Sequence, residues 1–504
     1  MLRGKITSWL RQHKDGLIIA LSLVIVFITF IKPLADSDLM WHLRIGQDIL
    51  TNRSIPMQDF LSFSMSGYSY VFHSWGAEVF LYLSYSLLGM WGVTLLYALV
   101  ATISVLFIGL SVRLFTNNSF AWLLLPLFSG YILAVSGLRT QLFTFTLLCF
   151  LVHILLNKKH SPLTDHSQTL LDFVRKLLTL FVLFMIWVNL HGGFVVGLLV
   201  LGVFLSTDVI VSNHKLMSIG RAIIVMVTSL IATLINPYTY RSLEQAFAMG
   251  TNTSALQSNG DWLPIQASKI YQWQPDFVFV LAVSALLYIL VLRKRDKYVK
   301  SFITATLFAG LLFISKRYMI ALAITLLPLA ITELYNSIKQ NFSKLFDKGL
   351  ILFWVIFALI ICSTVVTNIG NTINNNAYIL NFGSQAVLTR LPAGVFEYME
   401  QNDVPDRMLN EYDWGGYLEW IFPQNKYFID GRMDNFFTNG ESFLVTFGTI
   451  IHTQGDWEKR FNSYNFNAVL LKPGREIVSI LRDLPEWRVV YEDADAILIL
   501  RDED

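Results

Sequence analysis

Two aspartates separated by one residue stand at the end of the first long apolar segment of the chain. Asp36 and Asp38 follow the segment 16–34, and Trp41 and His42 come shortly after them. Ionisable side chains at the end of a membrane helix are costly to hold against lipid, and membrane proteins that keep them generally use them. A carboxylate in such a place can serve as a general base. One Asp would be enough to cap a following helix, so capping accounts for one member of the pair and leaves the other for chemistry.

The composition of the 504-residue chain is that of a polytopic membrane protein. Hydrophobic residues make up 54% of it and charged residues 15%, whereas a soluble domain has roughly 25% charged residues. The net charge of +2 gives no indication of nucleic-acid binding. Cys149 and Cys362 both lie in apolar segments, which favours buried small side chains over a disulfide or a metal site. The segment 16–34 follows basic residues but precedes no small-residue cleavage site, so we interpret it as a retained span.

Apolar segments of membrane-spanning length recur along the first three quarters of the chain. A span needs about 20 apolar residues, and on this basis we predict an α-helical membrane protein with about eleven transmembrane helices. We place them near 16–34, 91–113, 119–136, 138–156, 177–192, 194–212, 219–236, 276–292, 299–314, 319–335 and 349–368. The segment 73–89 is also apolar, but it begins with His73, Trp75 and Glu78. We predict that 39–50 and 73–89 are amphipathic helices on the outer membrane surface.

The positions of the basic residues predict the orientation. Lys and Arg gather on the cytoplasmic side of membrane proteins. With the spans above, the basic clusters at the N-terminus, 158–176, 214–221, 293–300 and 339–348 all fall on one face. The N-terminus is therefore predicted to be cytoplasmic, in a plasma-membrane protein whose C-terminal domain is extracytoplasmic. The predicted domains are a transmembrane domain 1–368 with a long first outer loop 35–90, a linker 369–389, and an α/β domain 390–504.

The short outer loops carry the other unusual side chains. Arg139 opens a span, and His191 lies in the turn Asn-Leu-His-Gly-Gly. Asn236 and Tyr238 belong to an Asn-Pro-Tyr turn at the end of another span. For Arg139 an interfacial anchor, and for His191 a simple turn residue, are equally consistent readings.

Two further cations stand at an outer span junction, where the positive-inside pattern does not expect them. Because Lys316 and Arg317 break that pattern, a functional role is favoured over snorkelling anchors. Trp75, Trp187 and Trp262 are typical of the aromatic belt at a membrane surface.

The tail has the short apolar runs of a soluble α/β domain. We predict strands at 408–410, 427–429, 468–471, 489–491 and 496–500, and helices at 394–401, 440–452 and 474–484. Two polar motifs, 410–417 and 430–434, follow predicted strands, where sites on sheets tend to lie. Arg432 stands between Asp430 and Asp434, which favours a structural ion pair over ligand binding.

These motifs together resemble the GT-C superfamily of membrane glycosyltransferases, which includes the protein O-mannosyltransferases and the lipid A aminoarabinose transferase. The chain is similar to a bacterial branch with a D-x-D-x-x-W-H-x-x-x-G loop, N-L-H-G-G and N-P-Y turns, and N-E-Y-x-W-G-G-Y and I-D-G-R motifs in the tail. Here these are 36–46, 189–193, 236–238, 410–417 and 429–432. The resemblance covers nearly the whole chain.

The resemblance implies transfer of a sugar from a polyprenyl-phosphate donor to an extracytoplasmic glycan, lipid or protein. Asp36 and Asp38 would then be catalytic, as base or as ligands of a divalent metal, and the phosphate would need cationic partners. The donor-binding residues implied are Trp41, His42, Arg139, His191, Asn236, Tyr238, Lys316 and Arg317. We expect one outer-facing cavity to gather Asp36, Asp38, His42, Arg139, His191, Lys316 and Arg317.

Two other functions remain open from the residues alone. A transporter or flippase of lipid-linked sugars would also need charges facing a cavity, although such proteins usually place polar residues or broken helices at mid-membrane. A non-catalytic assembly protein of the cell envelope would use the tail to bind a partner.

The predicted topology is testable with a reporter fused after Asp504 that is active only in the cytoplasm. Because the basic clusters place the tail outside, the fusion should be silent, while the same reporter inserted at 158–168 should be active. Activity of the Asp504 fusion would contradict the topology, and a membrane crossing at 73–89 would be the first error to suspect.

Overall fold

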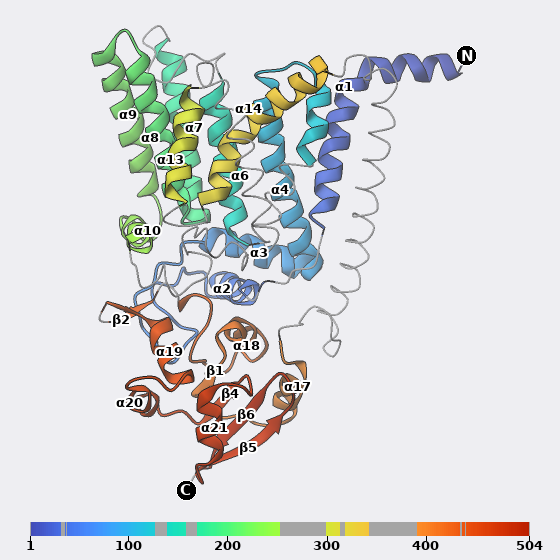
Figure 1. Cartoon of the computed structure of the whole chain (residues 1–504). Helices are drawn as coiled ribbons and strands as arrows, with labels where there is room; N and C mark the ends of the chain where they lie inside the picture. Colours follow the sequence, from blue (N-terminus) through green and yellow to red (C-terminus); the bar gives the residue numbers. More distant parts are fainter. Residues whose placement is uncertain are drawn as a thin grey trace. The chain divides into compact units, whose positions relative to one another are not determined.

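The computed structural model divides the chain into two compact units (Figure 1). The residues that it describes are 2–31, 36, 38–126, 139–157, 169–251, 299–312, 318–341, 391–433, 436–438 and 440–502. One unit, the helical unit, comprises Met1–Lys32, Thr94–Leu243 and Asp261–Thr372. The other, the loop–tail unit, comprises Pro33–Val93, Glu244–Gly260 and Ile373–Asp504. The first outer loop and the C-terminal domain, which the sequence analysis treats as separate, therefore share one unit.

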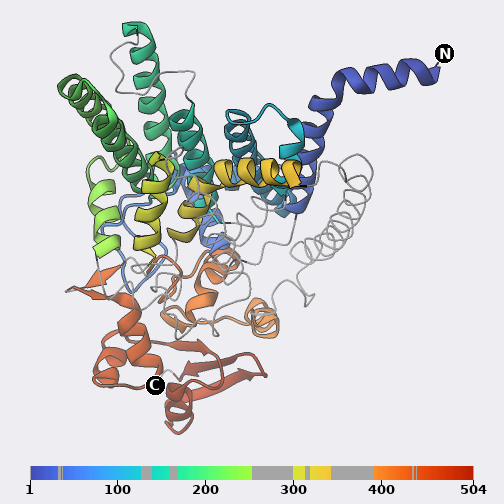
Figure 2. The same ribbon diagram turned by 45° about the horizontal axis from the view of Figure 1, so that its top comes forward.

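Long apolar helices make up the helical unit. They are α1 (Leu2–Thr29), most of α4 (Met90–Arg113), α6 (Gln141–Leu156), α7 (Leu170–Leu190), α8 (Phe194–Val211), α9 (Lys215–Thr233), α13 (Val299–Leu311) and α14 (Tyr318–Asn341). A short 3₁₀ helix, η1 (Ser119–Leu124), packs on α1. Helices α7, α8 and α9 pack side by side, with α13 against α8 and α14 against α6 and α13 (Figures 1 and 2).

Five helices in the described part of the chain are long and apolar enough to cross a membrane. They are Gln12–Thr29, Met90–Arg113, Phe194–Val211, Lys215–Thr233 and Tyr318–Ser337. The predicted fold class, a helical multi-pass membrane protein with an α/β tail, is confirmed, whereas the number of eleven spans is not. The predicted spans 276–292 and 349–368, the linker 369–389 and most of 119–136 lie outside the described residues.

Several helix boundaries differ from those predicted, for local reasons. Helix α1 starts at Leu2 and ends at Thr29, where we predicted 16–34, because the basic N-terminal residues are good helix formers and continue the helix. Helix α7 starts at Leu170, earlier than the predicted 177, because the Thr169 side chain accepts a hydrogen bond from the Asp172 N–H and caps it.

Two segments have a different structure from the one predicted. The segment after Asn118 begins as 3₁₀ helix rather than α-helix, and the Asn118 side chain caps it by accepting from Phe120 N. Helix α10 (Arg241–Thr251) follows the Asn-Pro-Tyr turn, where we predicted no helix.

Trp187 is a buried core residue, and its predicted place in an aromatic belt is therefore wrong. Its ring is fully buried, and its indole N–H donates to Thr144 Oγ1 at 3.0 Å. Gly197 on α8 lies so close that an added Cβ would be 2.4 Å from the Trp187 ring. The missing side chain is what lets α7 and α8 approach each other here.

In the loop–tail unit, the two predicted surface helices are present as α2 (Leu39–Asn52) and α3 (Trp75–Leu88). They pack closely, because a Cβ on Gly46 of α2 would lie 2.2 Å from the Glu78 carbonyl of α3. At 1.5 Å per residue, α3 is only ~21 Å long. That is shorter than the ~30 Å hydrocarbon core of a bilayer, so the helix length fits a surface helix better than a span.

The tail is an α/β fold with a four-stranded sheet in the order β1-β4-β6-β5. Strand β1 (Met408–Asn410) pairs in parallel with β4 (Ala468–Leu471), while β6 (Ile497–Arg501) pairs antiparallel with β4 and with β5 (Trp487–Glu492). A small hairpin, β2 (Phe437–Thr438) and β3 (Glu441–Ser442), stands apart. The helices are α17 (Ala393–Gln401), η4 (Tyr412–Trp414), α18 (Gly415–Ile421), α19 (Phe443–Ile451), α20 (Trp457–Ser463) and α21 (Glu476–Arg482).

The strand predicted at 427–429 is not formed. Tyr427 makes only isolated bridges, to Ser62 and Met408. The N–H groups of Phe428 and Ile429 donate instead to the side chain of Asn410. A side-chain amide thus takes the hydrogen bonds that a neighbouring strand would otherwise supply.

Candidate active site

The Asp36–Asp38 pair lies at the start of α2. Asp38 occupies the N-cap position, but its carboxylate makes no capping hydrogen bond. Asp36 Oδ1 accepts from the Asp38 N–H at 3.0 Å, and the Trp41 indole N–H donates to Asp38 Oδ1 at 3.3 Å. The Asp38 carboxylate is therefore not used for capping, and the Trp41 indole orients it.

His42, the next residue of the same motif, points into the protein. Its side chain is buried, with Nδ1 at 2.9 Å from Glu78 Oε1 on α3. The imidazole is tilted by 36° against the Trp41 ring, with 3.5 Å between the ring centroids. Burial raises the pKa of Glu78 well above its ordinary value, with Arg432 acting in the opposite direction. His42 thus ties α2 to α3 rather than presenting itself to solvent. Nothing in the sequence pointed to Glu78 as its partner.

A buried ion network joins the first outer loop to the tail. The Arg432 guanidinium donates to both carboxylate oxygens of Asp430, at 2.8 and 2.6 Å, and to Asp59 Oδ1 at 2.6 Å. Glu419 Oε1 on α18 lies 3.7 Å from it. Arg432, Asp59, Asp430 and Glu419 are all at most 3% exposed. The predicted structural ion pair of Arg432 is present with Asp430, whereas Asp434 lies outside the described residues.

Asp59 and Glu419 are members of this network that the sequence did not reveal. Asp59 accepts hydrogen bonds from the backbone N–H of Ser62 and from its hydroxyl, which is a local turn pattern with no hint of a distant arginine. Neither oxygen of Glu419 has a hydrogen-bond partner among the described residues. Burial, followed by the nearby Asp430, raises the pKa of Glu419 well above its ordinary value.

The tail motif at 410–417 holds the second motif, 429–432, in place. The Asn410 amide donates to the Ile429 carbonyl at 2.8 Å, and its oxygen accepts from Phe428 N at 2.9 Å. A Cβ on Gly415 would lie 2.0 Å from the Ile429 carbonyl. Glu411, also of this motif, is buried and pairs with Arg475. These residues therefore have structural roles.

In the helical unit, a hydrogen bond links the N-L-H-G-G turn to the N-P-Y turn. The Asn189 amide donates to the Met185 carbonyl in its own helix and to the Ile235 carbonyl beside the second turn. Asn236 uses its oxygen to accept from Tyr238 N and Ser242 Oγ, and its amide donates to two backbone carbonyls, those of Thr233 and Thr239. Both asparagines thus organise the turns, and Tyr238 is buried beside them.

His191 is held in one tautomer by its neighbours. The Gly193 N–H donates to His191 Nδ1 at 3.0 Å, and Thr144 Oγ1 lies 3.0 Å from the same nitrogen. Thr144 Oγ1 in turn accepts from the Trp187 indole N–H, which leaves its hydroxyl hydrogen for His191. Because Nδ1 is an acceptor, the imidazole proton is on Nε2. The turn reading and a functional reading of His191 are both compatible with this arrangement.

The remaining cations are only partly described. Arg139 lies just before α6 and is partly buried, with its carbonyl accepting from Leu142 N. Lys316 and Arg317 lie outside the described residues. The expected single cavity draws on residues of both units, and it stays a prediction.

Asp36 and Asp38 were also predicted as possible ligands of a divalent metal, which stays a prediction. In the part of the chain that the structure describes, no three His, Cys, Asp or Glu side chains gather as a metal site. Asp36 and Asp38 alone would suit an ion such as Mg²⁺, which is often held by one or two carboxylates together with substrate phosphate.

Solved membrane glycosyltransferases have a similar fold, although no protein-family model and no curated protein matches the sequence. The oligosaccharyltransferase AglB of Archaeoglobus fulgidus, in complex with an inhibitory peptide and a dolichol-phosphate, aligns with a TM-score of 0.58 at 10% identity over 92% of this chain and 70% of that chain. ArnT of Cupriavidus metallidurans, bound to undecaprenyl phosphate, aligns with a TM-score of 0.54 at 13% identity over 98% of each chain. The chain has the GT-C fold. At this identity the likeness concerns the fold alone, and the expected resemblance to GT-C proteins is confirmed at that level.

Removing the Arg432 side chain should strongly destabilise this chain. Arg432→Ala leaves Asp59 and Asp430 buried without their cation, and breaking a buried ion pair in this way typically costs about 3–5 kcal/mol. We expect a clear drop in the unfolding temperature of the purified full chain, followed by tryptophan fluorescence. Arg488→Ala is the matched control, because Arg488 pairs with Asp502 at the surface, where such pairs contribute about 0–1 kcal/mol. Equal unfolding temperatures for the two variants would contradict the structural role of the network.

Proposed function

We propose that this protein is a membrane glycosyltransferase that moves a sugar from a polyprenyl-phosphate donor to an extracytoplasmic acceptor. The observation that carries the proposal is the Asp36–Asp38 pair, in which the Asp38 carboxylate is oriented by Trp41 and is not used as a helix cap. The GT-C fold supports it, since the solved proteins that share this fold include an oligosaccharyltransferase and ArnT. The acceptor is a glycan, a lipid or a protein.

The proposed chemistry is an acceptor attack on the anomeric carbon of the donor sugar. A carboxylate of Asp36 or Asp38 takes the proton from the acceptor hydroxyl or amine, which then forms a bond to that carbon. The bond between the anomeric carbon and the phosphate oxygen breaks, and the polyprenyl phosphate leaves with the electron pair. Its negative charge needs preorganised cations.

We assign the donor phosphate to cations from several span ends. Arg139, Lys316 and Arg317 are the candidates, because a guanidinium can bind two phosphate oxygens at once. His191 joins this group as a neutral donor, since its proton is on Nε2. Trp41, His42, Asn236 and Tyr238 stay candidates for donor binding. In the structure Trp41 orients Asp38, His42 contacts Glu78, and Asn236 organises the turn beside the buried Tyr238.

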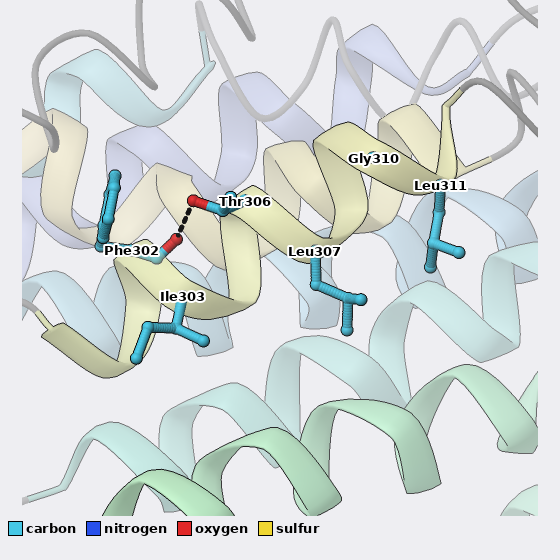
Figure 3. Close-up of a pocket in the computed structure, with 6 residues that line it drawn as sticks. All are labelled: Phe302, Ile303, Thr306, Leu307, Gly310 and Leu311. Atoms are coloured by element: carbon cyan, nitrogen blue, oxygen red, sulfur yellow. Dashed lines mark hydrogen bonds between the residues drawn. The ribbon is translucent and has the colours of Figure 1, made fainter.

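An apolar groove along α13 has the character needed for the lipid chain of such a donor. It has a volume of about 560 Å³ and is lined by Phe302, Ile303, Thr306, Leu307, Gly310 and Leu311. The Thr306 hydroxyl donates to the Phe302 carbonyl, so the one polar side chain of the lining bonds within its own helix (Figure 3). Such a surface can bind an isoprenoid chain through apolar contact, but none of the six side chains named here could hold a phosphate.

Replacing either aspartate by asparagine should reduce sugar transfer to a small residual rate without unfolding the protein. Loss of a general base typically lowers the rate by about 10²–10⁴-fold, whereas Asp→Asn keeps the shape of the side chain. The measurement is transfer of labelled sugar from a polyprenyl-phosphate donor in vesicles, with folded protein quantified beside it. Asp48→Asn is the matched control, because Asp48 lies on the same helix and bonds only to Asn52 in the described contacts. A chelator added to the wild-type assay separates the roles, since loss of transfer on chelation favours a metal and unchanged transfer favours a base.

The same assay distinguishes the alternative functions. A flippase would move the lipid-linked sugar across the vesicle membrane without transferring it, and an assembly protein would be indifferent to both substitutions. Full transfer by Asp36→Asn and Asp38→Asn would leave one of those functions standing in place of the enzyme.

Removing the guanidinium of Arg139 should weaken donor binding more than it slows turnover. If Arg139 holds the phosphate in the ground state as well as in the transition state, Arg139→Gln raises KM for the donor while kcat changes little. We expect the same of Arg317→Gln. Arg113→Gln is the control, because Arg113 is exposed at the far end of α4. A loss confined to kcat would instead place Arg139 in the chemical step.

A further inference from the structure

The I-D-G-R motif of the tail lies directly against the carboxylate of Asp38. A Cβ built on Gly431 would be 2.0 Å from Asp38 Oδ1 and 3.0 Å from Trp41 Nε1. Real Cβ atoms do not approach other atoms that closely, so an L side chain at this position would have to displace the carboxylate. Gly431 does not have a positive φ. Space for Asp38, and not backbone freedom, is therefore the reason for glycine here.

Gly431 is fixed on both sides by buried polar groups. Before it, Asp430 accepts from the N–H and the guanidinium of Arg432, and that guanidinium also reaches Asp59 in the first outer loop. The Tyr412 hydroxyl donates to the Gly431 carbonyl at 3.4 Å. The backbone at Gly431 is thus a rigid surface, because any shift would disturb a buried ion network.

Two hydrogen bonds fix the position of Asp38 on its other side. The backbone N–H of Asp38 donates to Asp36 Oδ1, and the Asp38 carboxylate oxygen Oδ1 accepts from the Trp41 indole N–H. The indole in turn packs on His42, which is anchored to Glu78. The carboxylate is therefore enclosed between a fixed indole and a fixed glycine backbone.

We propose that Gly431 is a positioning residue for Asp38, and that the tail completes the active site by forming one wall of it. This inference rests on the proposed function, because it takes Asp38 to be the reacting carboxylate. A displacement of about 1 Å in a reacting group can cost on the order of 10²-fold in rate. The tail acts by fixing the position of the Asp38 carboxylate. Its loss should therefore lower kcat and leave donor binding nearly unchanged.

The test is Gly431→Ala in the full chain, assayed in the same vesicles. The added methyl group pushes the Asp38 carboxylate away, so kcat should fall by about 10²-fold while KM for the donor changes less than about threefold. Gly448→Ala is the matched control, because a Cβ there has no atom within 4 Å. Normal kcat for Gly431→Ala, with Asp38→Asn inactive, would overturn the positioning role and leave the proposed function intact. Full activity of Asp38→Asn alone would also overturn the positioning role, whereas full activity of both Asp36→Asn and Asp38→Asn would overturn the proposed function itself.

A double variant separates positioning from a general structural effect. If Gly431 acts through Asp38, Gly431→Ala should cause no further loss of the residual transfer in an Asp38→Asn background. An additional loss of similar size in that background would overturn the proposal. Where Gly431→Ala lowers the amount of folded protein, Gly431→Ala with Asp38→Ala should recover it, because the shortened side chain leaves room for the methyl group. Failure to recover would mean that the methyl group collides with something other than Asp38, which also overturns the proposal.

Discussion

One buried guanidinium, that of Arg432, determines how the loop–tail unit is built. A charge that is fully withdrawn from water is tolerated only when it is paired and hydrogen-bonded. Its partners come from the adjacent residue Asp430, from α18 through Glu419, and from the first outer loop through Asp59. Burial alone would lower the pKa of Arg432. The three carboxylates together raise that pKa by more than burial lowers it, so the guanidinium stays charged. Because one partner comes from the first outer loop, neutralising this charge requires the loop to pack on the tail.

That requirement explains why polar motifs so far apart in sequence occur in one chain. The tail motif at 410–417 supports the backbone of 428–432, and Arg432 in that segment holds Asp59. The same segment presents Gly431 to Asp38. Residues near the C-terminus therefore help to fix the position of Asp38, a side chain of the N-terminal motif. The tail is a structural part of the outer-loop site, and a separate binding module would not need these contacts.

The sequence predicted what depends on local pattern and missed what depends on distant pairing. Strands 408–410 and 468–471 and helices α2 and α3 were predictable from their hydrophobic pattern. The Arg432–Asp59 contact joins positions 373 residues apart, and nothing near either residue indicates it. The predicted strand at 427–429 failed because a side chain, Asn410, takes its hydrogen bonds. The prediction of an interfacial Trp187 is wrong, because a sequence does not tell which helix face is covered.

In the helical unit, hydrogen bonds likewise fix the state of a polar side chain, here the neutral His191. His191 could carry its proton on either nitrogen, but the Gly193 N–H and the Thr144 hydroxyl both point at Nδ1. Protonating Nδ1 would leave these groups facing a donor, so the network favours the neutral ring with its proton on Nε2. Gly193 also lies close to Thr144, because a Cβ built on Gly193 would be only 2.4 Å from Thr144 Oγ1. In both units, then, a glycine allows close approach and a hydrogen-bonded network fixes the state of a polar side chain. Under the proposed function, this is the preorganisation that departure of a charged phosphate requires.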